Sequence, residues 1–108
     1  MYNLNRVTLI GTIGELELRC TPTGKKVISF TIATQQEPQQ LSEYAQVVSQ
    51  DYHKLVAWGK LAESISVRCR AGEKVFVEGR LKTSEFNNRH GSPDSRTEII
   101  VEDFYTVS

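Results

Sequence analysis

Apolar side chains recur at every second position along most of this 108-residue chain, which is the pattern of β-strands that bury one face. Five segments carry the pattern, at residues 6–20, 27–34, 52–58, 74–84 and 96–107. Gly11 and Gly14 interrupt the first segment, which predicts one long strand bent at these glycines, as closure of a small barrel requires. The side chains expected to point inward are Val7, Leu9, Leu16, Leu18, Cys20, Ile28, Phe30, Ile32, Leu55, Ala57, Val75, Val77 and Leu81.

The period changes once to that of a helix, over residues 60–70. One face of this helix carries Leu61, Ala62, Ile65 and Cys69. Gly72 then stands where a C-terminal cap is expected. The polar segment 35–51 contains Pro38 and little periodicity, so we expect a long mobile loop there, of a kind that is more often functional than idle.

The elements therefore follow the order β-β-β-α-β-β, with the helix between the third and fourth strands. This is the element order of the OB-fold. An SH3-like barrel also has five strands, but the position of the helix favours the OB arrangement. We therefore expect one all-β domain over residues 1–108, a five-stranded OB-fold barrel with one short helix between strands 3 and 4.

Composition narrows the class of protein further. The apolar fraction of 39% and the charged fraction of 24% are ordinary for a soluble globular domain. Because no apolar run reaches membrane-spanning length and MYNLNRV lacks the layout of a signal peptide, we expect a cytoplasmic protein without membrane contact. The net charge of zero gives no compositional sign of a nucleic-acid partner.

Patterns typical of metal sites, disulfides and catalytic centres are missing from the sequence. Cys20 and Cys69 lie far apart and have no partner at metal-ligand spacing, so we expect two buried, reduced thiols. No G-x-S-x-G elbow, phosphate-binding Gly-Lys-Ser/Thr loop or H-E-x-x-H motif occurs. We therefore expect no metal, no cofactor and no catalytic residue.

A candidate binding surface lies on the third strand. Tyr52, Lys54, Val56 and Trp58 alternate onto one of its faces, with the two rings about 20 Å apart. Bases of any identity stack on aromatic rings and lysine neutralises phosphate, so this row is typical of a platform for single-stranded nucleic acid. The alternative places both rings in the core. His53, Leu55 and Ala57 on the opposite face already supply the inward set, which favours the platform.

Further candidates flank this strand. Arg80 and Lys82 share one face of the fourth strand as candidate phosphate contacts, although paired surface charges are more often simply solvated. Phe86 follows at the base of a polar hairpin, where an exposed aromatic indicates binding and packing of the hairpin stem is the alternative. For the lone His53, a structural role at a subunit contact is favoured over a ligand or acid–base role.

Several stretches, in the right order and spacing, resemble the bacterial single-stranded DNA-binding proteins from Asn5 to about Phe104. They are N-R-V-T-L-I-G at 5–11, P-T-G at 22–24, V-I-S-F-T-I-A-T at 27–34, Y-H-K-L-V-A-W-G-K-L-A-E at 52–63, G-E-K-V-F-V-E-G-R-L-K-T at 72–83 and T-E-I-I-V at 97–101. The resemblance implies an OB barrel that assembles as a homotetramer and covers single-stranded DNA in replication, recombination and repair.

The resemblance also implies roles for single residues. Tyr52 and Trp58 would stack on bases, although the family usually has Trp and Phe at these positions, and Phe86 matches a further family aromatic. His53 corresponds to a histidine near the subunit interface of the family. The DNA-binding set that we expect is Tyr52, Trp58, Phe86, Lys54, Arg80, Lys82 and Arg6.

Three departures from the family pattern bear on these expectations. The bend near Glu15 is one residue shorter, and Pro38 stands about where the family often has a loop aromatic. Family members commonly continue into a flexible tail whose acidic tip recruits replication and repair enzymes, whereas this sequence ends at Ser108. Replication and repair enzymes are therefore doubtful partners. The resemblance implies a cytoplasmic, nucleoid-associated protein.

Two alternative functions stay open. The zero net charge and the missing loop aromatic slightly favour an OB module that mainly binds protein in a primosome-like assembly. The retained residues that argue against it are Tyr52, Trp58, Phe86, Arg80 and Lys82. An RNA-binding OB domain would rest on the same stacking and would differ only in contacts to the 2′-hydroxyl group.

Overall fold

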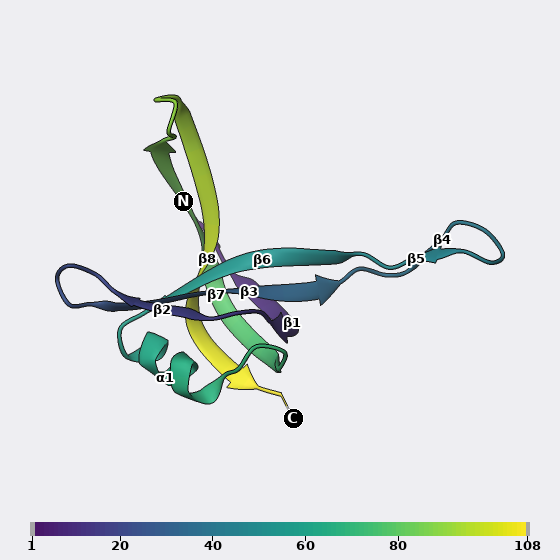
Figure 1. The fold of residues 1–108 in the computed structure, drawn as a ribbon, viewed down its shortest axis with the longest axis horizontal. Coiled ribbons are helices and arrows are strands. Elements are labelled where there is room, and N and C mark those ends of the chain that lie inside the picture. Colours follow the sequence, from purple (N-terminus) through teal and green to yellow (C-terminus); the bar gives the residue numbers. More distant parts are fainter. Residues whose placement is uncertain (1, 108) are drawn as a thin grey trace.

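The alternating segments form the strands of a barrel in the computed structural model, which describes residues 2–107 (Figure 1). In chain order the elements are β1 (Val7–Ile13), β2 (Glu17–Cys20), β3 (Lys26–Gln35), β4 (Gln39–Gln40), β5 (Gln46–Val47), β6 (Gln50–Trp58), α1 (Lys60–Arg68), β7 (Lys74–Asn87) and β8 (Pro93–Thr106). The predicted placement of one short helix after the strand that ends at Trp58 is confirmed.

The longer strands share one sheet, in the order β1-β7-β8-β6-β3-β2. This sheet closes into a barrel because the end of β1 pairs with β3, at Thr12 and Ile13. Neighbouring strands run antiparallel, except that β6 and β8 are parallel where they pair, at Leu55 and Val56. The predicted barrel is therefore confirmed, with the expected first strand divided into β1 and β2.

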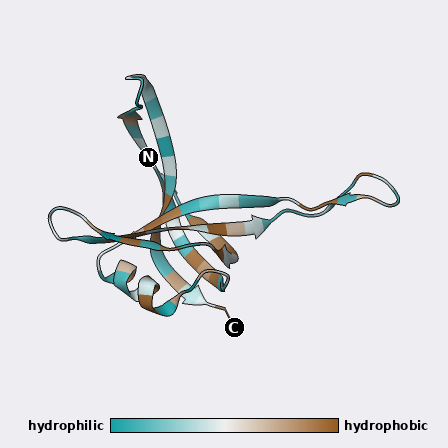
Figure 2. Cartoon of the chain, in the orientation of Figure 1, coloured by the Kyte–Doolittle hydropathy of each residue, from teal (hydrophilic) through white to brown (hydrophobic). Residues whose placement is uncertain are grey.

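The interior is filled by both the strands and the helix. The largest fully buried side chains are Ile13, Ile28, Ile32, Leu55, Ile65, Val75 and Val77. Ala62, Ile65 and Cys69 join this core, as the helical period predicts. The helix ends at Arg68, however, and Gly72 lies in the following turn with a φ of 93° rather than at the helix cap. Figure 2 shows the apolar residues gathered on the barrel strands and hydrophilic residues on the segments that project from it.

Two glycines allow strands to approach closely, one beside the β1–β3 closure of the barrel and one in the β7–β8 pair. A Cβ atom at Gly11 would collide with the backbone carbonyl of Ala33 on β3. A Cβ atom at Gly79 would collide with the carbonyl of Ile100 on β8. Gly79 also lies at a β-bulge, where the β7–β8 register shifts between Glu78 and Gly79. Such bulges turn the strands of a small barrel around its corner.

The prediction that Leu18 and Cys20 point inward is wrong. β2 lies at the edge of the sheet and pairs only with β3, so no further element covers it. Leu18 is 44% exposed and Cys20 is exposed, whereas Cys69 is buried as expected. Leu16, just before β2, does pack against the core.

Two polar segments are more regular than the sequence pattern predicts. Residues 35–51 form a two-stranded arm rather than an irregular loop, because the β3–β6 register continues to Gln35 and Gln50 and β4 then pairs with β5. β7 and β8 extend past the barrel as a long hairpin, seen at the top of Figure 1. Leu81, predicted to be inward, is 47% exposed because it lies where this hairpin leaves the barrel.

Candidate nucleic-acid interface

The two rings of the predicted platform lie on the outer face of β6. In the antiparallel pairing with β3, Tyr52 lies opposite Ala33 and Trp58 lies opposite Val27, so both rings share the face that Lys54 also occupies. Tyr52 is 70% exposed and Trp58 is 42% exposed. Neither ring therefore belongs to the core, which is filled from the opposite face of β6 by Leu55.

A groove runs along this face, formed by three adjoining hollows. The first hollow lies between β6 and the β7–β8 hairpin and is lined by Tyr52, Lys54 and Phe86, among others. The middle hollow shares Lys54 with the first and extends to Arg19 on β2. The third hollow shares Arg19 with the middle one and ends at Trp58. Their volumes are about 560, 650 and 360 Å³, sizes at which proteins hold small organic ligands.

Cations lie over two of the candidate stacking rings. The Nζ of Lys25 is 5.5 Å from the centre of the Trp58 ring. The guanidinium of Arg96 is 5.0 Å from the centre of the Phe86 ring, and Phe86 is 37% exposed. Both distances fall within the range of cation–π attraction. The groove thus combines exposed rings with positive charges placed beside them, and its middle hollow is also lined by Glu15, Glu17 and Glu98.

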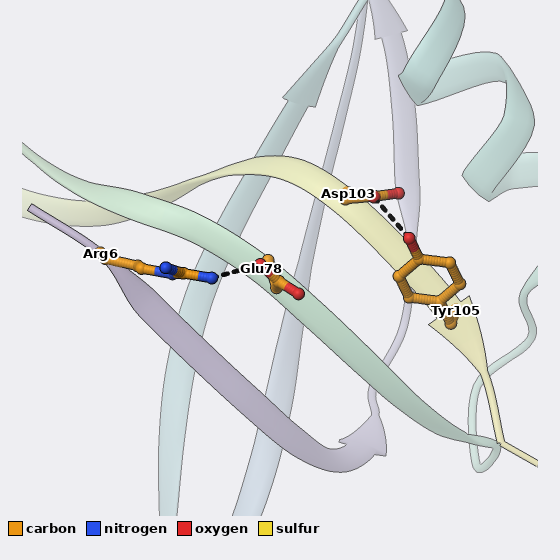
Figure 3. Close-up of polar contacts among 4 residues, drawn as sticks. All are labelled: Arg6, Glu78, Asp103 and Tyr105. Atoms are coloured by element: carbon orange, nitrogen blue, oxygen red, sulfur yellow. Dashed lines mark hydrogen bonds and ion pairs between the residues drawn. The ribbon is translucent and has the colours of Figure 1, made fainter.

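Three of the predicted DNA contacts lie outside these hollows. Arg80 and Lys82 are exposed on β7 but line none of the three. Arg6 precedes β1 and its Nη2 atom pairs with Oε2 of Glu78 at 3.4 Å (Figure 3). The structure therefore brings Tyr52, Lys54, Trp58 and Phe86 together along one groove and leaves these three cations elsewhere on the surface.

His53 points away from the platform, to the other face of β6. It is half-buried, and its Nε2 lies 2.9 Å from Oγ1 of Thr34 on β3. The hydrogen bond joins two paired strands, in keeping with a structural role. The predicted contact of His53 with another subunit stays a prediction.

The end of β6 that carries Trp58 is held by polar contacts to β3 and α1. The amide of Gly59 donates to the carbonyl of Lys26, and Nζ of Lys26 lies 2.6 Å from Oε1 of Glu63. The hydrogen bond and the charge of Glu63 raise the pKa of Lys26, and the same contact lowers the pKa of Glu63. Both groups are therefore charged at neutral pH, and they join the helix to the strand beside Trp58.

Sequence reasoning missed three cations of this surface, which are Arg19, Lys25 and Arg96. Strand pairing or a turn brings each of them beside a predicted residue. Arg19 on β2 pairs with Val27 on β3, and Val27 pairs with Trp58 on β6. The period of two places Arg96 on one face of its strand but does not show which strand lies next to it. A predicted register between the fourth and fifth strands could have found it.

Within residues 2–107 no three His, Cys, Asp or Glu side chains gather closely enough to hold a metal ion. Across that same range no helix has the length and apolarity needed to cross a membrane.

The fold and the sequence are both similar to those of known proteins. Residues 4–107 match the single-strand binding protein family. Single-stranded DNA-binding protein 1 of Chlorobaculum tepidum is 39% identical over 102 residues, which are 93% of this chain. The chain spans only 62% of the length of that relative.

Two solved structures share the architecture over nearly the whole chain. The Plasmodium falciparum SSB in complex with ssDNA has a TM-score of 0.84 and 26% identity, covering 100% of this chain and 98% of that one. A deletion mutant of the single-stranded DNA binding protein from Thermus aquaticus has a TM-score of 0.79 and 25% identity. That match covers 97% of this chain and 51% of the other.

Proposed function

The chain belongs to the single-strand binding protein family, and from this premise we propose that it binds single-stranded DNA without sequence preference and catalyses no reaction. The observation that carries the proposal is the exposure of Tyr52 and Trp58 at opposite ends of one groove. A strand of DNA that follows this groove would stack bases on both rings. Lys54, between them on β6, would neutralise phosphate.

The chemistry of the groove supports a sequence-independent mode of binding. Every base has a π-face, so stacking on Tyr52, Trp58 and Phe86 selects for unpaired bases rather than for their identity. A duplex keeps its bases stacked on one another and cannot offer them to these rings. The net charge of zero also makes stacking, rather than the release of many counterions, the larger part of the expected affinity.

Fluorescence titration tests this proposal directly, because Trp58 is the only tryptophan of the chain. The titrants are oligo-dT, oligo-rU and a duplex of the same length. The proposal expects a saturable change in Trp58 fluorescence with oligo-dT and little change with the duplex. Binding of oligo-rU with an affinity equal to or higher than that for oligo-dT would support RNA as the ligand instead. No fluorescence change with either single strand would contradict the proposal.

We also propose that copies of this chain assemble as a homotetramer and work on DNA in the bacterial cytoplasm. A surface distinct from the groove supports assembly: Ile10 and Tyr105 are 56% and 54% exposed, and the ring of Tyr105 lies 5.8 Å from that of Phe76. β1 forms one end of the strand order, so most of its length presents a free edge beside this patch. Light scattering at micromolar concentration should report a mass near four chains, and a stable monomer would contradict the assembly.

A further inference from the structure

Arg96 holds a position in the groove that no other residue shares. It is exposed on β8, and it is the one residue of the described range 2–107 that lines all three hollows. Tyr52 and Phe86 line the hollow on one side of it, and Trp58 lines the hollow on the other. Any strand that reaches from the first hollow to the third must therefore pass Arg96.

The side chain of Arg96 is held in place without losing its charge. Its guanidinium lies 5.0 Å from the centre of the Phe86 ring, which restricts the motion of the long side chain. In the part of the chain that the structure describes, Arg96 joins none of the ion pairs, whereas Arg6 pairs with Glu78 and Arg19 lies 3.9 Å from Glu17. Arg96 thus keeps its hydrogen-bond donors available in the middle of the groove.

Register explains why the Arg96 and Phe86 side chains meet. Ser84 lies opposite Arg96 and Asp94 lies opposite Phe86 in the antiparallel β7–β8 pair, so Arg96 and Phe86 are diagonal neighbours on one face. β6 and β8 pair only at Leu55 with Ile99 and at Val56 with Ile100, and Tyr52 and Arg96 precede these paired residues on their strands. Arg96 therefore projects from the β8 wall of the opening between them, across from Tyr52.

We propose that Arg96 is the central phosphate contact of this groove, binding the DNA backbone between the nucleotides stacked at Tyr52 or Phe86 and those stacked at Trp58. The inference rests on the proposed function and adds a binding residue to it. A guanidinium suits this role because its planar donor fork binds phosphate oxygens in pairs and its face can remain on an aromatic ring. The same geometry makes Arg96 more important for binding than Arg80 or Lys82, which lie outside the hollows.

The test compares Arg96→Ala with Arg89→Ala. Arg89 lies at the tip of the same hairpin, is exposed and lines none of the three hollows, so its removal changes the net charge equally. Affinity for oligo-dT is measured at several salt concentrations. Arg96→Ala should weaken binding about tenfold, and should lower the slope of log K against log salt by about 0.7, as loss of one phosphate contact to a single strand requires. Arg89→Ala should change neither quantity appreciably.

A conservative variant separates direct contact from positioning of Phe86. Arg96→Lys keeps the charge but not the planar group, so it should retain the wild-type salt slope and recover part of the affinity. If Arg96 only supported the Phe86 ring, Arg96→Ala would leave the salt slope unchanged, and that result would overturn the inference. Equal effects of Arg96→Ala and Arg89→Ala would overturn it as well.

The failure of this inference is distinguishable from failure of the proposed function. Wild-type protein that does not bind oligo-dT contradicts the proposed function itself. Wild-type protein that binds, together with an Arg96→Ala variant that binds equally well, contradicts only the role of Arg96. Melting curves of each variant show whether the fold survives, which is expected because Arg96 and Arg89 are both exposed.

Discussion

The Nζ of Lys25 lies over the ring of Trp58, 5.5 Å from its centre. Lys25 belongs to the turn before β3, whereas Trp58 is the last residue of β6. The turn before β3 presents this lysine: the amide of Lys25 donates to Oγ1 of Thr21, and the amide of Thr21 donates to the carbonyl of Lys25. A positive charge therefore lies over one face of the Trp58 ring. The arrangement places a cation beside the ring on which we propose that a base stacks.

Replacing this lysine should therefore affect binding more than folding. Lys25→Ala is expected to lower the salt slope of oligo-dT binding by about 0.7, because one phosphate contact is lost. In the free protein the variant should also make Trp58 more accessible to acrylamide, because the lysine ammonium no longer lies over the ring. Quenching and salt titrations check both results, and a variant with wild-type behaviour in the two measurements would contradict this role for Lys25.

Substitution at the bulge of β7 tests the close packing of β7 against β8. Gly79→Ala should destabilise the fold by about 2–3 kcal/mol, because its Cβ atom would collide with the carbonyl of Ile100 and the paired strands cannot both move aside. Gly91→Ala is the matched control at the hairpin tip, where φ is 77° but the new Cβ atom meets nothing within 4 Å. That change should cost only about 1 kcal/mol of backbone strain. Urea denaturation measures both, and equal costs would show that the collision at Gly79 is relieved.

The two cysteines should differ sharply in reactivity. Cys20 is exposed on the edge strand β2, whereas Cys69 is buried and its burial raises the pKa of the thiol. Because the thiolate is the reactive form, a raised pKa slows reaction at pH 8 in addition to the loss of access. A disulfide reagent should therefore modify one thiol per folded chain, and Cys20→Ser should abolish that reaction. Rapid modification of both thiols without denaturant would contradict the burial of Cys69.

The sequence predicts the barrel well because its signal is local. Alternation and one change of period are enough to place the strands, α1 and most of the core, and they also place Tyr52 and Trp58 on the face opposite Leu55. Burial of a particular strand depends on its neighbours. Leu18 has the right period for an inward residue but lies on an edge strand that nothing covers, so the prediction fails there.

The sequence pattern predicts only part of the candidate site. Arg96 and Lys25 acquire their positions from the register of β8 with β7 and from the turn before β3, and these are tertiary relationships that a strand period does not contain. The sequence pattern does not predict the arm over residues 35–51, because β4 and β5 are only two residues long and are too short to show an alternation.

The central claim is that Tyr52 and Trp58 form an exposed stacking surface, and paired binding and melting measurements on their alanine variants test it most directly. Each substitution should weaken binding to oligo-dT by about 1–3 kcal/mol. Lys54→Ala, between the rings on the same face, should cost less and should lower the salt slope. The melting temperatures should fall only modestly, because the rings are 70% and 42% exposed and leave no internal cavity when removed. A loss of about 3–5 kcal/mol in stability, the cost of truncating a core aromatic, together with unchanged affinity per folded molecule would contradict the claim.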